Sequence, residues 1–175
     1  MRRIFKAGML LAGSVMFVTL GGLAIAQKTG DAQFARKAAT GGMMEVELGK
    51  LAVQKASNEK VKQFGQRMID DHSKAGDDLK GVAAKENITL PTELSPRQKA
   101  IVDRFSSMSG TAFDRAYMRD MLRDHQTDVA EFQNEANNGS NADLKSWATT
   151  TLPTLQEHLR IAKETETSLG VTSRK

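Results

Sequence analysis

The chain has 175 residues, with 25 basic and 21 acidic side chains, three histidines and no cysteine, and its formal net charge is +4. Three of the basic residues and no acidic residue fall in the first 26 positions, which leaves 22 basic against 21 acidic residues in the remainder. This near balance excludes a nucleic-acid-binding protein of the usual basic kind. The absence of cysteine excludes disulfides and thiolate chemistry.

Residues 1–26 have the features of a cleaved signal peptide. Arg2, Arg3 and Lys6 form a basic start. An apolar run follows and ends in Ala24-Ile25-Ala26, the small-x-small pattern that precedes a cleavage site. An uncleaved membrane anchor is the alternative, because the run is about long enough to span a bilayer. We predict cleavage, which leaves no integral membrane span and an exported, periplasmic chain of one domain.

Two long amphipathic helices are predicted for residues 31–56 and 58–87, because apolar or small residues recur three and four positions apart. Asn58 is a good N-cap for the second helix, and Pro91 prevents its continuation. The inward positions are Phe34, Ala38, Gly41, Glu45, Leu48 and Ala52 in the first helix, and Val61, Phe64, Met68, His72, Ala75, Leu79 and Val82 in the second.

The connection over residues 88–110 is long for a helical bundle. Ser95-Pro96 predicts the start of a short helix within it, since serine is a good N-cap and proline suits the first helical position. This helix contains Ile101, Val102 and Phe105. If these side chains were exposed together, they would indicate a binding surface for a partner.

Two further long helices are predicted, one starting after Thr111 and one over residues 141–168, with a turn at 137–140 between them. Thr111 and Asp114 have the spacing of a capping box. Residues 171–175 are predicted to form a disordered tail. The inward positions are Phe113, Tyr117, Met121, His125, Val129, Phe132 and Ala136, and then Leu144, Ala148, Thr151, Leu155, His158 and Ala162.

Three residues interrupt these helical patterns. Pro153 cannot donate a backbone hydrogen bond, so we expect a kink there or a division of the last helix into two shorter ones. Gly41 and Gly42 lower the stability of the first helix. We expect them to permit the close approach of another helix beside Glu45.

The pattern predicts an all-α fold: a ferritin-like four-helix bundle over residues 27–170, with a long crossover that carries a short extra helix. A crossover along the bundle makes the second and third long helices parallel, which brings His72 and His125 to nearly the same level, together with Glu45. His158 fits less well, because it lies some five residues past the point that faces His125, or about 7 Å along the axis.

The three histidines lie on the apolar stripes of three different helices, and Glu45 lies on the stripe of the fourth. A buried carboxylate with two or three imidazoles has the composition of a transition-metal site. The alternative is a hydrogen-bonded cluster of neutral imidazoles and Glu45 that serves only the structure. The predicted site is Glu45, His72, His125 and His158.

Several side chains flank this predicted site. Neighbours on a helix point about 100° apart, so the carboxylate before a histidine does not pair with it but can orient an imidazole of an adjacent helix. Solvated positions at the edge of the stripe are the alternative for these carboxylates. The flanking carboxylates are Asp71, Asp124, Asp128 and Glu157.

Met68 and Met121 each precede a histidine by four residues, within a shared Met-aliphatic-x-Asp-His pattern. Residues four apart lie on one helix face, and a thioether with an imidazole suits soft or borderline ions such as copper. The alternative is that both methionines only fill gaps in the core.

Several classes of enzyme are disfavoured. The di-iron bundle requires Glu-x-x-His on two helices, but Ile69, Leu122 and Leu155 stand three before the histidines. The chain also contains no Gly-x-Ser-x-Gly elbow, no phosphate-binding loop and no dinucleotide-binding fingerprint.

Five segments carry a family resemblance: residues 41–52, residues 61–72, Ile88-Thr89-Leu90-Pro91, residues 113–117 and residues 152–158. Over nearly all of residues 31–168 the chain resembles an exported, ferritin-like bacterial family of unknown function numbered 4142, often labelled "predicted outer membrane protein". The resemblance implies a bacterial envelope protein with a ferritin-like bundle.

The chain is also similar, more distantly, to small exported ferritin-like proteins associated with copper. Those proteins carry Met-Ile-Pro-His-His, and Asp71 and Asp124 stand here where that group has its first histidine. This resemblance implies copper among the candidate ions.

Three functional hypotheses follow. The first is a module that binds or buffers a transition metal ion, namely copper, zinc, iron or manganese. The second is a non-catalytic envelope module with a structural, stress-protective or partner-binding role, acting with an envelope protein or as a homo-oligomer, in which the buried cluster fixes helix register. An enzyme with a metal-dependent redox step ranks last, because no Glu-x-x-His pair is present.

Overall fold

The structure is a computed structural model that describes the backbone of residues 20–170 and the side chains of residues 30–170. Residues 1–19, most of the predicted signal peptide, and residues 171–175, the predicted tail, lie outside the described residues. Signal cleavage and tail disorder therefore remain predictions. None of the described helices is long and apolar enough to cross a membrane.

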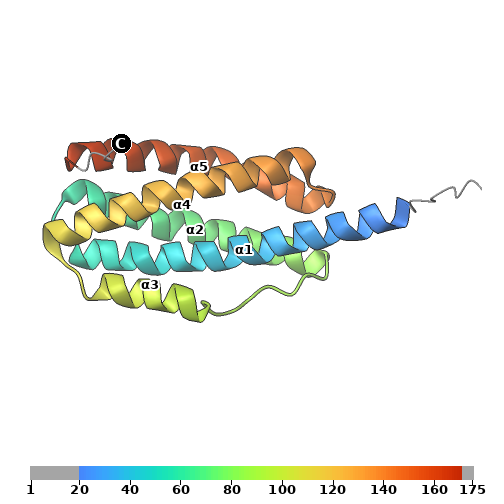
Figure 1. The fold of residues 1–175 in the computed structure, drawn as a ribbon, viewed down its shortest axis with the longest axis horizontal. Coiled ribbons are helices and arrows are strands. Elements are labelled where there is room, and N and C mark those ends of the chain that lie inside the picture. Colours follow the sequence, from blue (N-terminus) through green and yellow to red (C-terminus); the bar gives the residue numbers. More distant parts are fainter. Residues whose placement is uncertain (1–19, 171–175) are drawn as a thin grey trace, which may run out of the picture.

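Four long helices and one short helix make up the fold: α1 (Leu20–Lys55), α2 (Glu59–Lys85), α3 (Pro96–Ser106), α4 (Gly110–Asn138) and α5 (Ala142–Ser168). The hairpins α1–α2 and α4–α5 pack together, and the crossover between them runs back along the bundle, so α2 and α4 are parallel (Figure 1). No strand occurs among residues 20–170. The predicted ferritin-like four-helix bundle with a crossover helix is confirmed.

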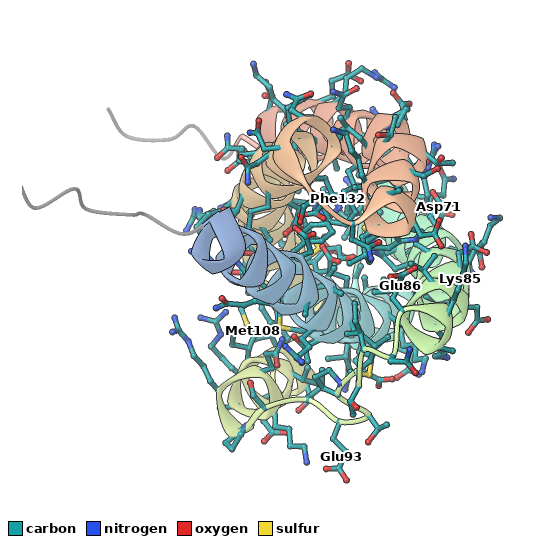
Figure 2. All side chains as sticks on the ribbon, turned by 90° about the vertical axis from the view of Figure 1, so that its right-hand side faces the viewer. Asp71, Lys85, Glu86, Glu93, Met108 and Phe132 are labelled. Atoms are coloured by element: carbon teal, nitrogen blue, oxygen red, sulfur yellow. The ribbon has the colours of Figure 1, made fainter. Side chains whose placement is uncertain are left out.

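The crossover helix α3 lies outside the four-helix bundle, against α1 (Figure 2). A capping box opens it, because the Ser95 hydroxyl accepts from the Gln98 backbone N–H while the Gln98 side chain accepts from the Ser95 N–H. Phe105 is fully buried, and Ile101 and Val102 are half-buried against the same apolar cluster. This helix therefore presents no exposed apolar patch of the kind that would indicate a partner.

The N-caps of the other helices are the ones predicted from the sequence, with one exception. Asn58 accepts from the Lys60 N–H and Asn141 from the Leu144 N–H, as expected of N-caps. The predicted capping box of Thr111 and Asp114 is wrong, since α4 begins after Ser109 without a side-chain cap. The Asp114 side chain accepts hydrogen bonds from another part of the bundle instead.

Asp114 binds the turn between α1 and α2. Its buried carboxylate accepts from the backbone N–H groups of Ser57 and Asn58, each at 3.0 Å, and from the Ser57 hydroxyl. These contacts satisfy donors that a helix start leaves without partners. They also tie the first hairpin to the start of the second.

Asp31 lies near the start of the part of α1 whose side chains are described, and it makes the corresponding contacts with the turn between α4 and α5. It accepts from the backbone N–H groups of Ser140 (3.1 Å) and Asn141 (2.7 Å) and from the Ser140 hydroxyl. Equivalent residues of the two sets of contacts are separated by the same number of residues. Asp114 follows Asp31 by 83 residues, and Ser140-Asn141 follows Ser57-Asn58 by 83 residues. The two hairpins are thus held by reciprocal contacts, each from the first helix of one to the turn of the other.

The close helix approach occurs at a different pair of glycines from the one predicted. A Cβ on Gly41 would meet no atom within 4 Å, and one on Gly42 would meet only His72 Nδ1 at 3.8 Å. A Cβ on Gly49 would lie 2.6 Å from the Gly65 carbonyl oxygen, so α1 and α2 cross there. Adding a methyl group at that crossing would overlap backbone atoms, whereas Gly41 and Gly42 leave open space.

Pro153 does not divide the last helix. α5 is continuous from Ala142 to Ser168, and the exposed Pro153 ring faces solvent. The side chains of Thr149, Thr150 and Thr151 donate to the carbonyls four residues earlier, which provides bonds within the preceding turn. Apolar packing of Leu152 and Leu155 holds the helix on both sides of the proline.

The core consists of two apolar clusters, one toward each end of the bundle. The first contains Leu48, Ala52, Ala56, Val61, Phe64, Met68, Phe105, Phe113, Tyr117, Met118, Met121 and Ala162. The second contains Ala35, Leu79, Phe132, Leu144, Trp147, Ala148, Leu152 and Leu155. The predicted stripes supply most of these residues, and a polar layer separates the two clusters.

Replacing Asp114 by alanine is expected to lower the free energy of unfolding by about 3 kcal/mol, because two buried N–H groups and a hydroxyl lose a charged acceptor. Asp103→Ala, at an exposed position on α3, is the matched control and should stay within about 0.5 kcal/mol of wild type. Urea unfolding measures both changes. Equal stability of the two variants would contradict this role of Asp114.

Candidate metal centre

Each of the four long helices contributes one polar side chain to the layer between the apolar clusters. Glu45 comes from α1, His72 from α2, His125 from α4 and His158 from α5, and their exposed fractions are 3%, 8%, 0% and 0%. On at least one side of each of them, the residue one helical turn away belongs to an apolar cluster. The structure thus brings the four residues of the predicted site together.

His158 lies at the same level as His125, which corrects the offset expected from the sequence. His125 lies thirteen residues before the end of α4 at Asn138, and His158 sixteen residues after the start of α5 at Ala142. The difference of three residues is about 4.5 Å along the axis. Side chains tilt toward the start of their own helix, and in antiparallel helices these tilts converge here, which closes the remaining distance.

The imidazoles of His125 and His158 face one another. Nε2 of His125 lies 3.3 Å from Nδ1 of His158. The opposite nitrogen of His125, Nδ1, lies 3.0 Å from the Met121 carbonyl oxygen, and that of His158, Nε2, lies 2.7 Å from Asp71 Oδ2. Both outward nitrogens face oxygens that can only accept, so both must carry their proton there.

The facing nitrogens of His125 and His158 are then both unprotonated in the neutral rings. The third ring repeats the arrangement: His72 Nδ1 lies 3.2 Å from Glu45 Oε2, and His72 Nε2 has no hydrogen-bond partner among the described residues. One nitrogen from each of the three rings lies within 4.8 Å of the others. The three imidazoles therefore bring ligand-type nitrogens into one small volume.

Asp71 has the orienting role that was one of its two predicted alternatives. It lies on α2 and reaches His158 on α5, between the two helices (Figure 2). Arg67, one turn earlier, holds the same carboxylate at 3.2 Å. Asp71 is therefore fixed from both sides.

The other flanking residues lie at different distances from the centre. Glu157 is paired with Arg160 on the surface and is not part of the site. Asp124 is half-buried and lies 3.8 Å from Arg123. Met68 and Met121 are fully buried within the first apolar cluster, where their packing accounts for their position.

Glu45 faces a second carboxyl group, that of Asp128 on α4. One ligand-type atom from each of Glu45, His125 and Asp128 lies within 4.8 Å of the others. Burial raises the pKa of Glu45 well above its usual range, and burial followed by repulsion from Asp124 raises the pKa of Asp128 to about 7. Both shifts favour the protonated form of these carboxyl groups. Asp128 follows Glu45 by 83 residues, the same offset as that between Asp31 and Asp114, and this repeat is the sequence signal that relates the two carboxyl groups.

All three imidazoles are held neutral by their surroundings. Burial lowers the pKa of His72 well below its usual range and the pKa of His125 to about 3. His125 and His158 lower the pKa of His72 further, and His158 lowers that of His125. Burial also lowers the pKa of His158, although Asp71 opposes the shift. Neutral imidazole is the form that ligates metal ions.

A pocket of about 960 Å³ reaches this layer from the surface and is lined by residues of all four long helices and of the crossover. Among the residues of the centre only Glu45 and His72 line it, beside Asp124 and Asp128. Much of the rest of the wall is apolar. No sequence pattern indicated this pocket.

Comparisons with known proteins agree with the fold. The sequence profile of the family described as Domain of unknown function (DUF4142) matches residues 22–165, in agreement with the resemblance of the motifs. No curated protein matches the chain.

Three solved structures share the architecture. The first is a DUF305 fragment from Deinococcus radiodurans, with 15% sequence identity and a TM-score of 0.67, and the match covers 81% of this chain and 96% of that one. The second is the putative secreted protein DUF305 from Streptomyces coelicolor, with 14% identity and a TM-score of 0.68, over 83% of this chain and 96% of that one. The third is CopM in the Cu(I)-bound form, with 16% identity and a TM-score of 0.64, over 77% of this chain and 93% of that one. At these identities the likeness shows the fold.

His125→Gln is expected to remove part of the acid sensitivity of the metal-free protein. Since the pKa of His125 is lowered in the folded state, the unfolded state binds one more proton below its ordinary value of 6.5, and stability is lost as the pH falls. The raised carboxyls act in the opposite direction in both proteins. The stability difference between wild type and variant should therefore change by about 1 kcal/mol per pH unit from pH 6 to 4, in the variant's favour. Urea unfolding at three pH values measures it; parallel curves would contradict it.

Proposed function

This chain belongs to the DUF4142 family, and from that premise we propose that it is an exported bundle protein that binds one transition metal ion at His72, His125 and His158. The observation that carries the proposal is the pair of facing, unprotonated nitrogens 3.3 Å apart on His125 and His158. In neutral rings two lone pairs at this distance repel one another. A cation between them removes the repulsion and uses both.

The surroundings of the rings support the same proposal. Histidines that ligate metals donate their other N–H to a carboxylate or a backbone carbonyl. All three rings have such a partner: Glu45 for His72, the Met121 carbonyl for His125 and Asp71 for His158. We assign Glu45 the task of orienting His72 rather than that of a fourth ligand.

The donor set selects among the candidate ions. Three imidazole nitrogens suit copper or zinc better than manganese, which prefers oxygen ligands. CopM, which shares the fold, is described in a Cu(I)-bound form, so copper(I) and zinc are the first ions to test. The signal-like residues 1–26 and the secreted structural neighbour support a role in the periplasm, where such a site would buffer the ion.

One alternative has its own supporting observation. If His158 carried two protons, it would donate to both Asp71 and His125, and the layer would be a purely structural hydrogen-bond chain. The lowered pKa of His158 opposes this protonation at neutral pH.

Protein purified untagged from the periplasm of its native cells should contain about one equivalent of copper or zinc by mass spectrometry. A variant with His72, His125 and His158 all changed to glutamine should lose nearly all of it, while Glu157→Gln, beside His158 but on the surface, should retain it. Wild type that contains no metal and takes up none on reconstitution would overturn the proposal in favour of the structural alternative.

Asp71→Asn is expected to weaken the affinity for the ion by about 10- to 100-fold, because the amide can present its N–H₂ to His158 and no longer fixes its tautomer. The ligands themselves remain, so stoichiometry should stay at one ion. Asp70→Asn, the exposed neighbour that pairs with Gln66, is the matched control. Competition with a chromophoric chelator measures the affinities. An unchanged affinity in Asp71→Asn would show that the carboxylate does not position His158.

A further inference from the structure

The pocket and the histidine layer meet at one place. His125 and His158 are fully buried, whereas Glu45 and His72 line the pocket floor with Asp128, and Asp124 also lines the wall. The pocket is a route from the surface to the layer. An ion that enters this pocket meets Glu45, Asp128 and the His72 ring before it can reach the two fully buried imidazoles.

The two consecutive glycines of α1 keep this route open. Both line the pocket, and a Cβ on Gly41 would project into space empty for 4 Å, while a Cβ on Gly42 would meet only the ring of His72. Glycine in a helix interior lowers stability by roughly 0.5–1 kcal/mol relative to alanine. Close packing does not explain the pair, since the close approach of α1 lies at Gly49.

The carboxyl groups at the pocket floor have the chemistry of a cation-binding position. Glu45 Oε1 is buried and has no hydrogen-bond donor among the described residues. Asp128 faces it from the opposite helix, within 4.8 Å for one ligand atom of each. The lysines of the pocket wall are paired with other acids, Lys37 with Glu131 and Lys80 with Asp77.

We propose that this pocket is the access route of the metal ion and that Glu45 and Asp128 form an outer position where the cation stops before it reaches the three imidazoles. Asp124 adds negative charge on the way. The inference rests on the proposed metal-binding function and extends it to how the ion enters and leaves. Access through the pocket controls rates, whereas the imidazoles control affinity.

Gly41→Leu tests the route. Zn²⁺ is mixed with the metal-free full chain in a stopped-flow instrument, and the association rate constant is compared with the equilibrium affinity from chelator competition. We expect the rate to fall at least about tenfold while the affinity stays within about threefold of wild type, since a narrowed channel slows entrance and exit alike. Gly81→Leu, an exposed helical glycine of α2 outside the pocket, is the matched control and should change neither quantity.

Asp128→Asn tests the outer position. Loss of its charge should lower the association rate about tenfold, in the range by which local charge steers ions, with affinity again nearly unchanged. Glu131→Gln, one turn further along α4, controls for the loss of a nearby acid. A weakened affinity at an unchanged rate would make Asp128 part of the final site and overturn the proposal.

The outcomes separate the inference from the function on which it rests. If wild type binds neither Zn²⁺ nor Cu⁺, the metal-binding function fails and the route fails with it. If wild type binds, and both Gly41→Leu and Asp128→Asn bind at the wild-type rate, only the access route is overturned. Circular dichroism together with unchanged affinity shows that the variants are folded.

Discussion

The arrangement of the bundle depends on two buried aspartates that connect its hairpins. Asp31 and Asp114 each accept two backbone N–H groups of the turn in the opposite hairpin. Apolar helix faces can pack at several axial positions with similar free energies. A buried carboxylate that must accept from particular N–H groups can do so at only one axial position of its helix. The four polar side chains of the central layer come from four helices, so they can meet only if this axial register is held.

Burying the polar side chains of the central layer costs free energy, which the apolar packing in the rest of the core offsets. Burying a carboxyl group and three imidazoles between apolar clusters removes their hydration, and the shifted pKa values of Glu45, His72 and His125 express that loss. Burial raises the pKa of Glu45 and lowers the pKa values of the three imidazoles, so it disfavours the charged form of each. Neutral rings with fixed tautomers are ready to bind a cation, because no proton has to leave first.

A repeated offset of 83 residues relates the contacts of the two aspartates and the carboxyl pair of the site. Asp31 corresponds to Asp114, Ser57-Asn58 to Ser140-Asn141, and Glu45 to Asp128. The histidines do not follow this offset, since Leu155 stands 83 residues after His72. The contacts of the two aspartates and the carboxyl pair therefore follow one repeat, whereas the imidazoles do not: His72 lines the pocket beside Glu45 and Asp128, and His125 and His158 lie outside its lining.

The sequence alone determined the elements: the periodicity of apolar residues, the N-caps Asn58 and Asn141 and the long crossover specified a four-helix bundle, and the inward position of each histidine followed from the same stripes. These are local properties, readable within a few helical turns. Only the tertiary structure decided that His158 is level with His125, that Asp114 holds a distant turn, that Gly49 rather than Gly41 marks the helix crossing, and that a pocket reaches Glu45. Each of these depends on distances between helices, on side-chain tilt in antiparallel neighbours and on which buried donors lack a partner, and these quantities exist only once the helices have packed.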